Sequence, residues 1–187
     1  MTCIVGLVEE DRAAVWLGAD SMATSGWGHK HIMATSKIVQ LGQFLAVAVT
    51  GNLTSITALQ HWLDTPRYVA GDSQERWVAR ELWPAILDAH RSGLYIAEDE
   101  REIEAEFLVA LDGHLYILSG DGAVLEPRTA FAATGSGGEV AFGALAQSSV
   151  RKKGYERRIV EALEAAQLGN AYVDDPFGVL KIPVSGR

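Results

Sequence analysis

A threonine in second place is the first residue whose type and position could do chemistry. The chain opens Met1-Thr2, and because residue 2 is small, we expect the initiator methionine to be removed. A threonine hydroxyl is a poor nucleophile at neutral pH and needs a base. The freed α-amine, whose unperturbed pKa is about 7.7–8.0, is a suitable base. Thr2 is therefore a candidate to supply both a nucleophile and its general base.

Two charged residues fall where they could tune this centre. Asp20 ends the second of two apolar runs, and a hairpin between the runs would return it to the neighbourhood of residue 2. Lys37 lies within a third predicted strand. Buried near the amine, Lys37 would lower the pKa of the amine and stabilise a developing alkoxide. A buried lysine is costly unless paired, and Asp20 is the obvious partner. Taken alone, Asp20 also fits a turn residue and Lys37 an outward-facing strand residue.

Apolar periodicity divides the chain into blocks of strands and pairs of helices. Strands are predicted over 2–8, 13–19, 31–41, 44–49, 107–111, 115–118, 124–125, 130–134 and 177–184. Helices are predicted over 52–63, from an N-cap at Asp72-Ser73 to Gly93, over 140–147 and over 155–168. Pro84 should kink the second helix, and Asp112-Gly113 gives the strongest hairpin signal.

This order of elements excludes an alternating β-α chain with a parallel sheet. Two antiparallel sheets packed face to face, with a helix pair on each outer face, would bury every apolar stripe. The predicted fold class is therefore α+β, as a four-layer αββα sandwich.

The composition fits one soluble domain over 1–187. The chain has 187 residues, of which 48% are hydrophobic and 21% charged, and this length suits a single core. The net charge of −8 argues against a nucleic-acid partner, and we interpret the basic cluster Arg151, Lys152, Lys153, Arg157 and Arg158 as a solvated face or subunit contact. The single cysteine and the lack of an apolar run as long as a membrane span predict a cytoplasmic protein without a membrane partner.

Five motifs occur in one order along nearly the whole chain. They are T-C-I-V-G-L from Thr2, G-A-D-S around Asp20, S-K-I around Lys37, an apolar strand ending T-G at Gly51, and G-S-G-G around Ser136. In this order and spacing, the chain resembles the catalytic β-subunits of proteasomes and the bacterial HslV-type peptidase. These proteins are N-terminal nucleophile hydrolases with a four-layer αββα fold.

The resemblance implies a role for one residue of each motif. Thr2 matches the nucleophile, Asp20 and Lys37 match the acid and base pair, Gly51 matches the glycine whose amide forms the oxyanion hole, and Ser136 matches the serine that hydrogen-bonds the terminal amine. The implied activity is that of a threonine-type endopeptidase without a metal or organic cofactor. The implied assembly is a homo-oligomer of stacked rings that degrades proteins and peptides and is often fed by a separate ATPase unfoldase.

The sequence departs from the family pattern before its last strand. The family has an Asp and then a Ser-Gly-Gly there, whereas this chain has Asn170 in place of the Asp and Val173 in place of the Ser. Part of the support for the amine is thus expected to be missing or to come from Asp174. The earlier segment Trp27-Gly28-His29-Lys30-His31 is also unusual. These differences indicate a divergent bacterial or viral homologue.

Other residues fit other chemistry less well. His29 and His31 share a strand face, but no third ligand follows at the spacing of a zinc site. The glycine-rich segment 135–138 has neither the ending of a P-loop nor the pattern of a nucleophile elbow. Cys3 lies in an apolar run, which predicts a buried and inert thiol. Two alternatives to an endopeptidase remain, namely an N-terminal nucleophile amidase acting on a small-molecule amide and a ring subunit of the same fold that does not cleave.

Overall fold

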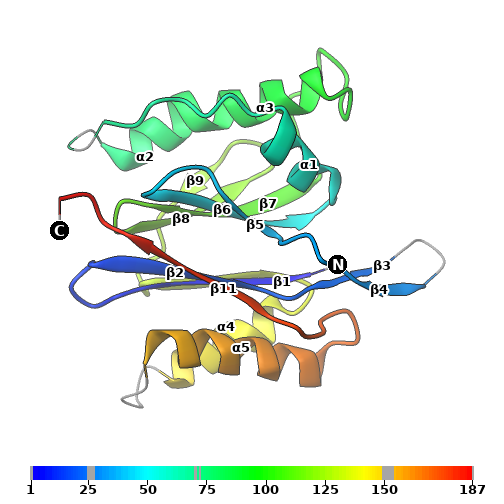
Figure 1. The fold of residues 1–187 in the computed structure, drawn as a ribbon, viewed down its shortest axis with the longest axis vertical. Helices are drawn as coiled ribbons and strands as arrows, with labels where there is room; N and C mark the ends of the chain where they lie inside the picture. Colours follow the sequence, from blue (N-terminus) through cyan, green and yellow to red (C-terminus); the bar gives the residue numbers. More distant parts are fainter. Residues whose placement is uncertain (1, 25–27, 70, 72, 149–153, 187) are drawn as a thin grey trace.

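Four layers of secondary structure make up the part of the protein that the structure describes. The computed structural model describes residues 2–24, 28–69, 71, 73–148 and 154–186. The expectations for Met1, Trp27, Asp72 and the basic residues at 151–153 lie outside these ranges. Two antiparallel sheets lie face to face, and helices cover both outer faces (Figure 1). The predicted αββα sandwich is confirmed. Among the described residues, no helix is both long and apolar enough to span a bilayer.

The first sheet carries the N-terminal residues and has the strand order β10-β1-β2-β11. Its strands are β1 Cys3–Val8, β2 Ala14–Ala19, β10 Phe131–Gly135 and β11 Gly178–Pro183. Side chains of β1 alternate between layers, as they do in any strand. Ile4 packs between the two sheets, whereas Cys3, Val5 and Leu7 pack against α4 (Gly138–Ser148) and α5 (Tyr155–Gly169).

The second sheet has the strand order β5-β6-β7-β8-β9. Its strands are β5 Ile38–Gln40, β6 Leu45–Gly51, β7 Ala105–Leu111, β8 His114–Ser119 and β9 Val124–Leu125. The outer face is covered by α1 Thr54–His61, α2 Gln74–Trp77, the π-helical turn η1 Val78–Leu82 and α3 Trp83–Ser92. The predicted hairpin joins β7 and β8 through Asp112 and Gly113, which have φ values of 46° and 83°. Positive φ at both central residues is what a tight hairpin turn requires.

The predicted strand over 31–41 is wrong as a single element. The chain instead forms β4 (Lys30–Ile32), which pairs with β3 (Met22–Thr24) in a small separate sheet, and then enters the large sheet at β5. Between them the Ser36 hydroxyl accepts the amide proton of Ile38, which interrupts the ladder. Lys37 therefore directly precedes β5 instead of lying inside a strand. The three-residue strand β3 escaped prediction because it is too short to show an alternating pattern.

The helix that contains Pro84 is interrupted where the sequence predicts a disturbance. The π-helical turn η1 ends two residues before Pro84, which lies in the first turn of α3. Proline has no N–H to donate to the preceding turn, and π turns often occur at such points. Val78, Leu82, Ile86 and His90 nevertheless all lie buried on the inner side.

Candidate active site

The ends of several strands bring the predicted residues to one edge of the sandwich. Thr2 precedes β1, Asp20 follows β2, Lys37 precedes β5, Gly51 ends β6 and Ser136 follows β10. The antiparallel register pairs the first residue of β1 with the last of β10, and the second with the last of β2. Figure 1 shows the N-terminus between the two sheets, beside the β3–β4 hairpin. Segments far apart in the sequence therefore meet at residue 2.

Lys37 points at the Thr2 hydroxyl from inside the protein. Its Nζ donates to Thr2 Oγ1 at 2.9 Å, to Asp20 Oδ1 at 2.8 Å and to the Met22 carbonyl at 2.6 Å. An ammonium has three protons, so these three oxygens satisfy it fully. Burial lowers the pKa of Lys37 from its usual 10.5, and the neighbouring Asp20 carboxylate acts in the opposite direction. The contacts favour a charged lysine that donates to the Thr2 oxygen.

Asp20 holds that lysine in place from a buried position of its own. Besides Lys37, its Oδ1 accepts from the Cys3 amide at 2.9 Å, and its Oδ2 accepts from the Met22 amide at 3.0 Å. The two side chains of the ion pair are only 1% and 0% exposed. Such a pair is shielded from the solvent that weakens surface ion pairs. Its geometry is fixed by backbone amides next to residue 2.

Ser136 contacts the backbone of Thr2. Its Oγ accepts from the Thr2 nitrogen at 3.2 Å and lies 3.2 Å from the Thr2 carbonyl oxygen, to which it donates. Asn170 supports Ser136 in turn, because Asn170 Nδ2 donates to the Ser136 carbonyl at 2.6 Å. The residue that stands in place of the family's aspartate thus orients the loop that carries Ser136.

Gly51 has a conformation that other residues rarely adopt. Its φ is +96°, and a Cβ at this position would lie 2.5 Å from the Glu104 carbonyl oxygen. The same end of β6 lies beside Thr2, since a Cβ on Gly135 would lie 2.2 Å from the Thr2 carbonyl oxygen and 2.7 Å from Thr50 Oγ1. The residue before Gly51 therefore reaches the neighbourhood of residue 2.

A polar layer that the sequence did not reveal closes the space between the sheets. Alternate residues of four strands, among them Ile4, Ala48, Leu108 and Ala132, form the apolar layer between the sheets. Two residues closer to the active-site end of each strand, the same faces carry polar residues, namely Thr2, Thr50, Glu106 and Thr134. The Thr134 hydroxyl donates to the Glu106 carboxylate. The signal in the sequence is a polar residue at the end of an apolar alternation. It becomes recognisable only once the four strands are aligned.

Val173, the second departure from the family pattern, and the neighbouring Asp174 have different surroundings. Val173 is buried and packs in the layer that contains Cys3 and α5. The Asp174 carboxylate accepts from Gln167 Nε2 at 2.6 Å and from the Asp175 amide at 3.0 Å. Asp174 therefore ties its loop to α5.

Residues that fitted other chemistry also have defined places. His31 lies on β4, which is exposed throughout, and no group of three or more His, Cys, Asp or Glu side chains within the described ranges could hold a metal ion. Cys3 is buried and free, and desolvation, with a smaller effect of the Asp20 carboxylate, raises the pKa of its thiol from 9.0 to about 12. A thiol with so high a pKa is a poor nucleophile at neutral pH.

Comparison with known proteins places this geometry in a family context. No protein-family model matches the chain. The ATP-dependent protease subunit HslV of Caldicellulosiruptor saccharolyticus is 37% identical over 84 residues, which is 44% of this chain and 47% of that relative. The match thus spans about half the length of the curated relative.

Solved structures match over almost the entire chain. Thiobacillus denitrificans BPH has a TM-score of 0.80 and 22% identity, with 100% of both chains covered. The same protein in complex with epoxomicin gives 0.79 and 21%, over 98% of this chain and 100% of that one. HslV from Trypanosoma brucei gives 0.68 and 18%, over 97% and 99% of the two chains. The chain therefore has the fold of BPH and HslV, and a little under half of it is similar in sequence to an HslV subunit.

Proposed function

We propose that the chain is a threonine-type endopeptidase subunit whose nucleophile is Thr2 after removal of Met1. The observation that carries this proposal is the hydrogen bond of 2.9 Å from Lys37 Nζ to Thr2 Oγ1, made by a lysine that is itself paired with the buried Asp20. A hydroxyl that faces a buried ammonium is stabilised as it becomes an alkoxide. A structural threonine at a chain end has no need of such a partner.

Each residue then has one task in the reaction. The α-amine of Thr2, directly or through a water, takes the proton from Oγ1, and Lys37 stabilises the oxygen as it attacks a peptide carbonyl. The Gly51 amide donates to the tetrahedral oxyanion, an interaction of about 3–4 kcal/mol in a comparable site. The amine returns the proton to the leaving nitrogen, which leaves an ester on Thr2. Water then hydrolyses the ester and restores the hydroxyl.

Ser136 has a positioning task in this scheme. Its Oγ lies 3.2 Å from the Thr2 nitrogen, so it would accept a proton of the processed amine and aim the nitrogen lone pair at Oγ1. Lys37 is a poor candidate for the base, because its three contacts already use an ammonium's three protons. The amine is left as the acceptor of the hydroxyl proton.

We further propose that the subunits form rings that enclose the sites and admit unfolded protein. Support comes from the sequence match to HslV, described as an ATP-dependent protease subunit, and from the fold shared with HslV and BPH. An ATPase partner is part of this proposal. Electron microscopy of the purified protein tests the ring assembly.

Covalent labelling tests the proposed nucleophile. Intact mass shows first whether residue 2 is the N-terminus. The processed protein is then treated with a peptide epoxyketone such as epoxomicin, the ligand in one of the BPH structures. One adduct per chain, mapped by peptide mass spectrometry to Thr2, is the expected result, with loss of peptidase activity in parallel.

Three variants sharpen the outcome. Thr2→Ala should take no label, Thr2→Ser should keep part of the reactivity because the hydroxyl remains, and Lys37→Met should lose it. An adduct on Cys3 would contradict the assignment. If the processed wild-type protein does not react, and Thr2→Ala leaves any residual peptidase activity unchanged, Thr2 is not the nucleophile and the catalytic assignment fails.

A further inference from the structure

A buried histidine lies outside the proposed catalytic group and is paired through both ring nitrogens. His90, on α3, is 1% exposed. Its Nδ1 lies 2.7 Å from the Ile86 carbonyl oxygen, and its Nε2 lies 2.9 Å from Ser55 Oγ. A carbonyl can only accept, so Nδ1 carries a proton. In the neutral ring, Nε2 then accepts the proton of the Ser55 hydroxyl. The contacts therefore specify one neutral tautomer of His90.

The partner of this histidine belongs to the turn that follows Gly51. Ser55 is fully buried in the first turn of α1. Its amide donates to the Asn52 carbonyl at 3.2 Å, and the Asn52 amide donates to the Glu104 carbonyl at 2.8 Å. Since Asn52 directly follows Gly51, these bonds run from the His90 ring to the Gly51–Asn52 peptide, which is next to the peptide whose amide is proposed to bind the oxyanion.

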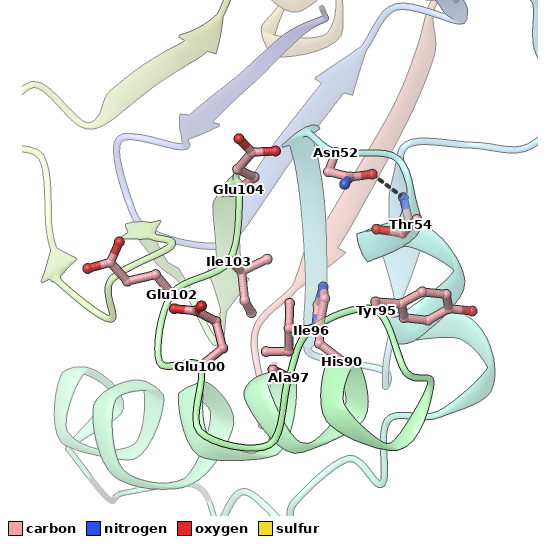
Figure 2. A pocket seen from close by; sticks show the side chains of 10 residues that line it. All are labelled: Asn52, Thr54, His90, Tyr95, Ile96, Ala97, Glu100, Glu102, Ile103 and Glu104. Carbon is pink, nitrogen blue, oxygen red and sulfur yellow. Dashed lines mark hydrogen bonds between the residues drawn. The ribbon is translucent and has the colours of Figure 1, made fainter.

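A cavity borders this histidine. Figure 2 shows the side chains that line a cavity of about 410 Å³, among them His90 itself and Tyr95. The carboxylates of Glu100, Glu102 and Glu104 also line this cavity. All three residues lie on the segment that joins α3 to β7.

The groups around His90 act on its protonation in opposite directions. Burial lowers its pKa from the usual 6.5, and the bond to the Ile86 carbonyl opposes that shift. From α1 the ring faces the neutral Ser55, and on the remaining side it meets the edge of Tyr95, with ring centroids 6.4 Å apart. The next residue, Arg91, is cationic, and its guanidinium donates to the Glu100 carbonyl at 2.7 Å and to the Asp88 carboxylate at 3.1 Å.

We propose that His90 is a positioning residue for the Gly51 amide, and that its protonation loosens the first turn of α1 and weakens the oxyanion site. Protonation turns Nε2 into a donor, so the Ser55 hydroxyl has to reverse, and it places a charge in a buried contact between α3 and α1. The weakening of the oxyanion site rests on the proposed function, whereas the loosening of the first turn of α1 does not.

The structural consequence is tested by hydrogen exchange of the peptide that covers 50–56. His90→Gln removes the titrating ring, Ser55→Ala removes its partner, and His61→Gln, an exposed histidine on α1, is the matched control. At neutral pH the first two variants should exchange at least about threefold faster in this segment than wild type, and the control should not. After correction for intrinsic rates, wild type should show the same increase as the pH is lowered through the folded pKa of His90, which burial places below 6.5.

The catalytic consequence is tested by the pH profile of epoxyketone labelling. Below the folded pKa of His90, the logarithm of the wild-type labelling rate should rise with pH with a slope of about two, one proton on the Thr2 amine and one on His90. His90→Gln and Ser55→Ala should be slower at neutral pH and show a slope of about one, because one of the two linked protons no longer matters. A purely structural defect would lower the rate without changing the slope.

The outcomes separate this inference from the proposed function. Faster exchange over 50–56 in a protein that takes no label would overturn the peptidase assignment and keep the positioning role. Labelling of wild type with unchanged exchange and an unchanged slope in both variants would overturn the positioning role and keep the peptidase. If His90→Gln fails to fold, Ser55→Ala carries both measurements.

Discussion

Replacement of Lys37 by methionine tests the buried pair at the centre of the site. Methionine keeps much of the length of the side chain and removes the ammonium. The Asp20 carboxylate then retains the Cys3 and Met22 amides but loses its counter-charge. Removing one partner of a buried ion pair typically costs about 3–5 kcal/mol. Because total stability is about 5–15 kcal/mol, Lys37→Met should lose a large part of it.

The assay is urea unfolding followed by tryptophan fluorescence, at one protein concentration for all variants. Asp20→Asn combined with Lys37→Met removes both charges, so the double variant should be more stable than the sum of the single effects predicts, by about 2 kcal/mol. Arg157→Met, which breaks an exposed pair with Glu161, should leave the unfolding free energy almost unchanged.

A small effect would refute the reasoning. If Lys37→Met lowers the free energy of unfolding by less than about 1 kcal/mol, or if the double variant is simply additive, Asp20 and Lys37 are not a coupled buried pair. The lysine would then be free to act in another charge state, and its proposed role toward Thr2 would need revision.

Three further predictions concern other parts of the molecule. Gly51→Ala should destabilise the protein by at least about 1 kcal/mol in urea unfolding, because φ is +96° and the new Cβ would meet a carbonyl. Gly143→Ala, on α4 where a Cβ meets nothing within 4 Å, should instead stabilise it by about 0.5–1 kcal/mol. Cys3, whose thiol pKa is raised to about 12, should resist iodoacetamide near pH 8 until the protein unfolds; rapid alkylation of the folded protein would contradict this. Since the pKa of His90 is lowered in the folded state, the unfolded chain binds its proton more readily. The unfolding free energy should therefore fall as pH drops from about 6.5 through the folded pKa, and His90→Gln should flatten that limb of a stability–pH profile.

The fold was largely predictable because the apolar pattern is regular. The continuous apolar runs of β1, β2, β6 and β7 have to be buried on both faces, and the helical spacing in α1 and α5 gives each helix one apolar side to bury. Prediction failed between residues 31 and 41, where small polar residues break one apparent strand into two. Nothing local distinguishes a strand that continues from one that changes sheets, since that choice depends on the pairing partners.

The candidate site was predictable where its chemistry lies in side chains, and not where it lies in the backbone. Residue types and motif spacing predicted four of its side chains, those of Thr2, Asp20, Lys37 and Ser136. The Met22 carbonyl, which accepts from Lys37 at 2.6 Å, could not be predicted, because every residue has a carbonyl. The tertiary structure alone also shows that His90 faces Ser55, since α3 and α1 are separated by a long connection.

The sequence by itself determined which residues are apolar, which carry protons and in what order they occur, because periodicity and side-chain chemistry are local properties. It therefore determined the layers and a short list of reactive groups. Only the tertiary structure decided which of these groups touch, because the register between strands sets distances between residues far apart in the chain. One register places the Lys37 ammonium 2.9 Å from the Thr2 hydroxyl; a shift by one residue would turn that side chain to the opposite face of the sheet.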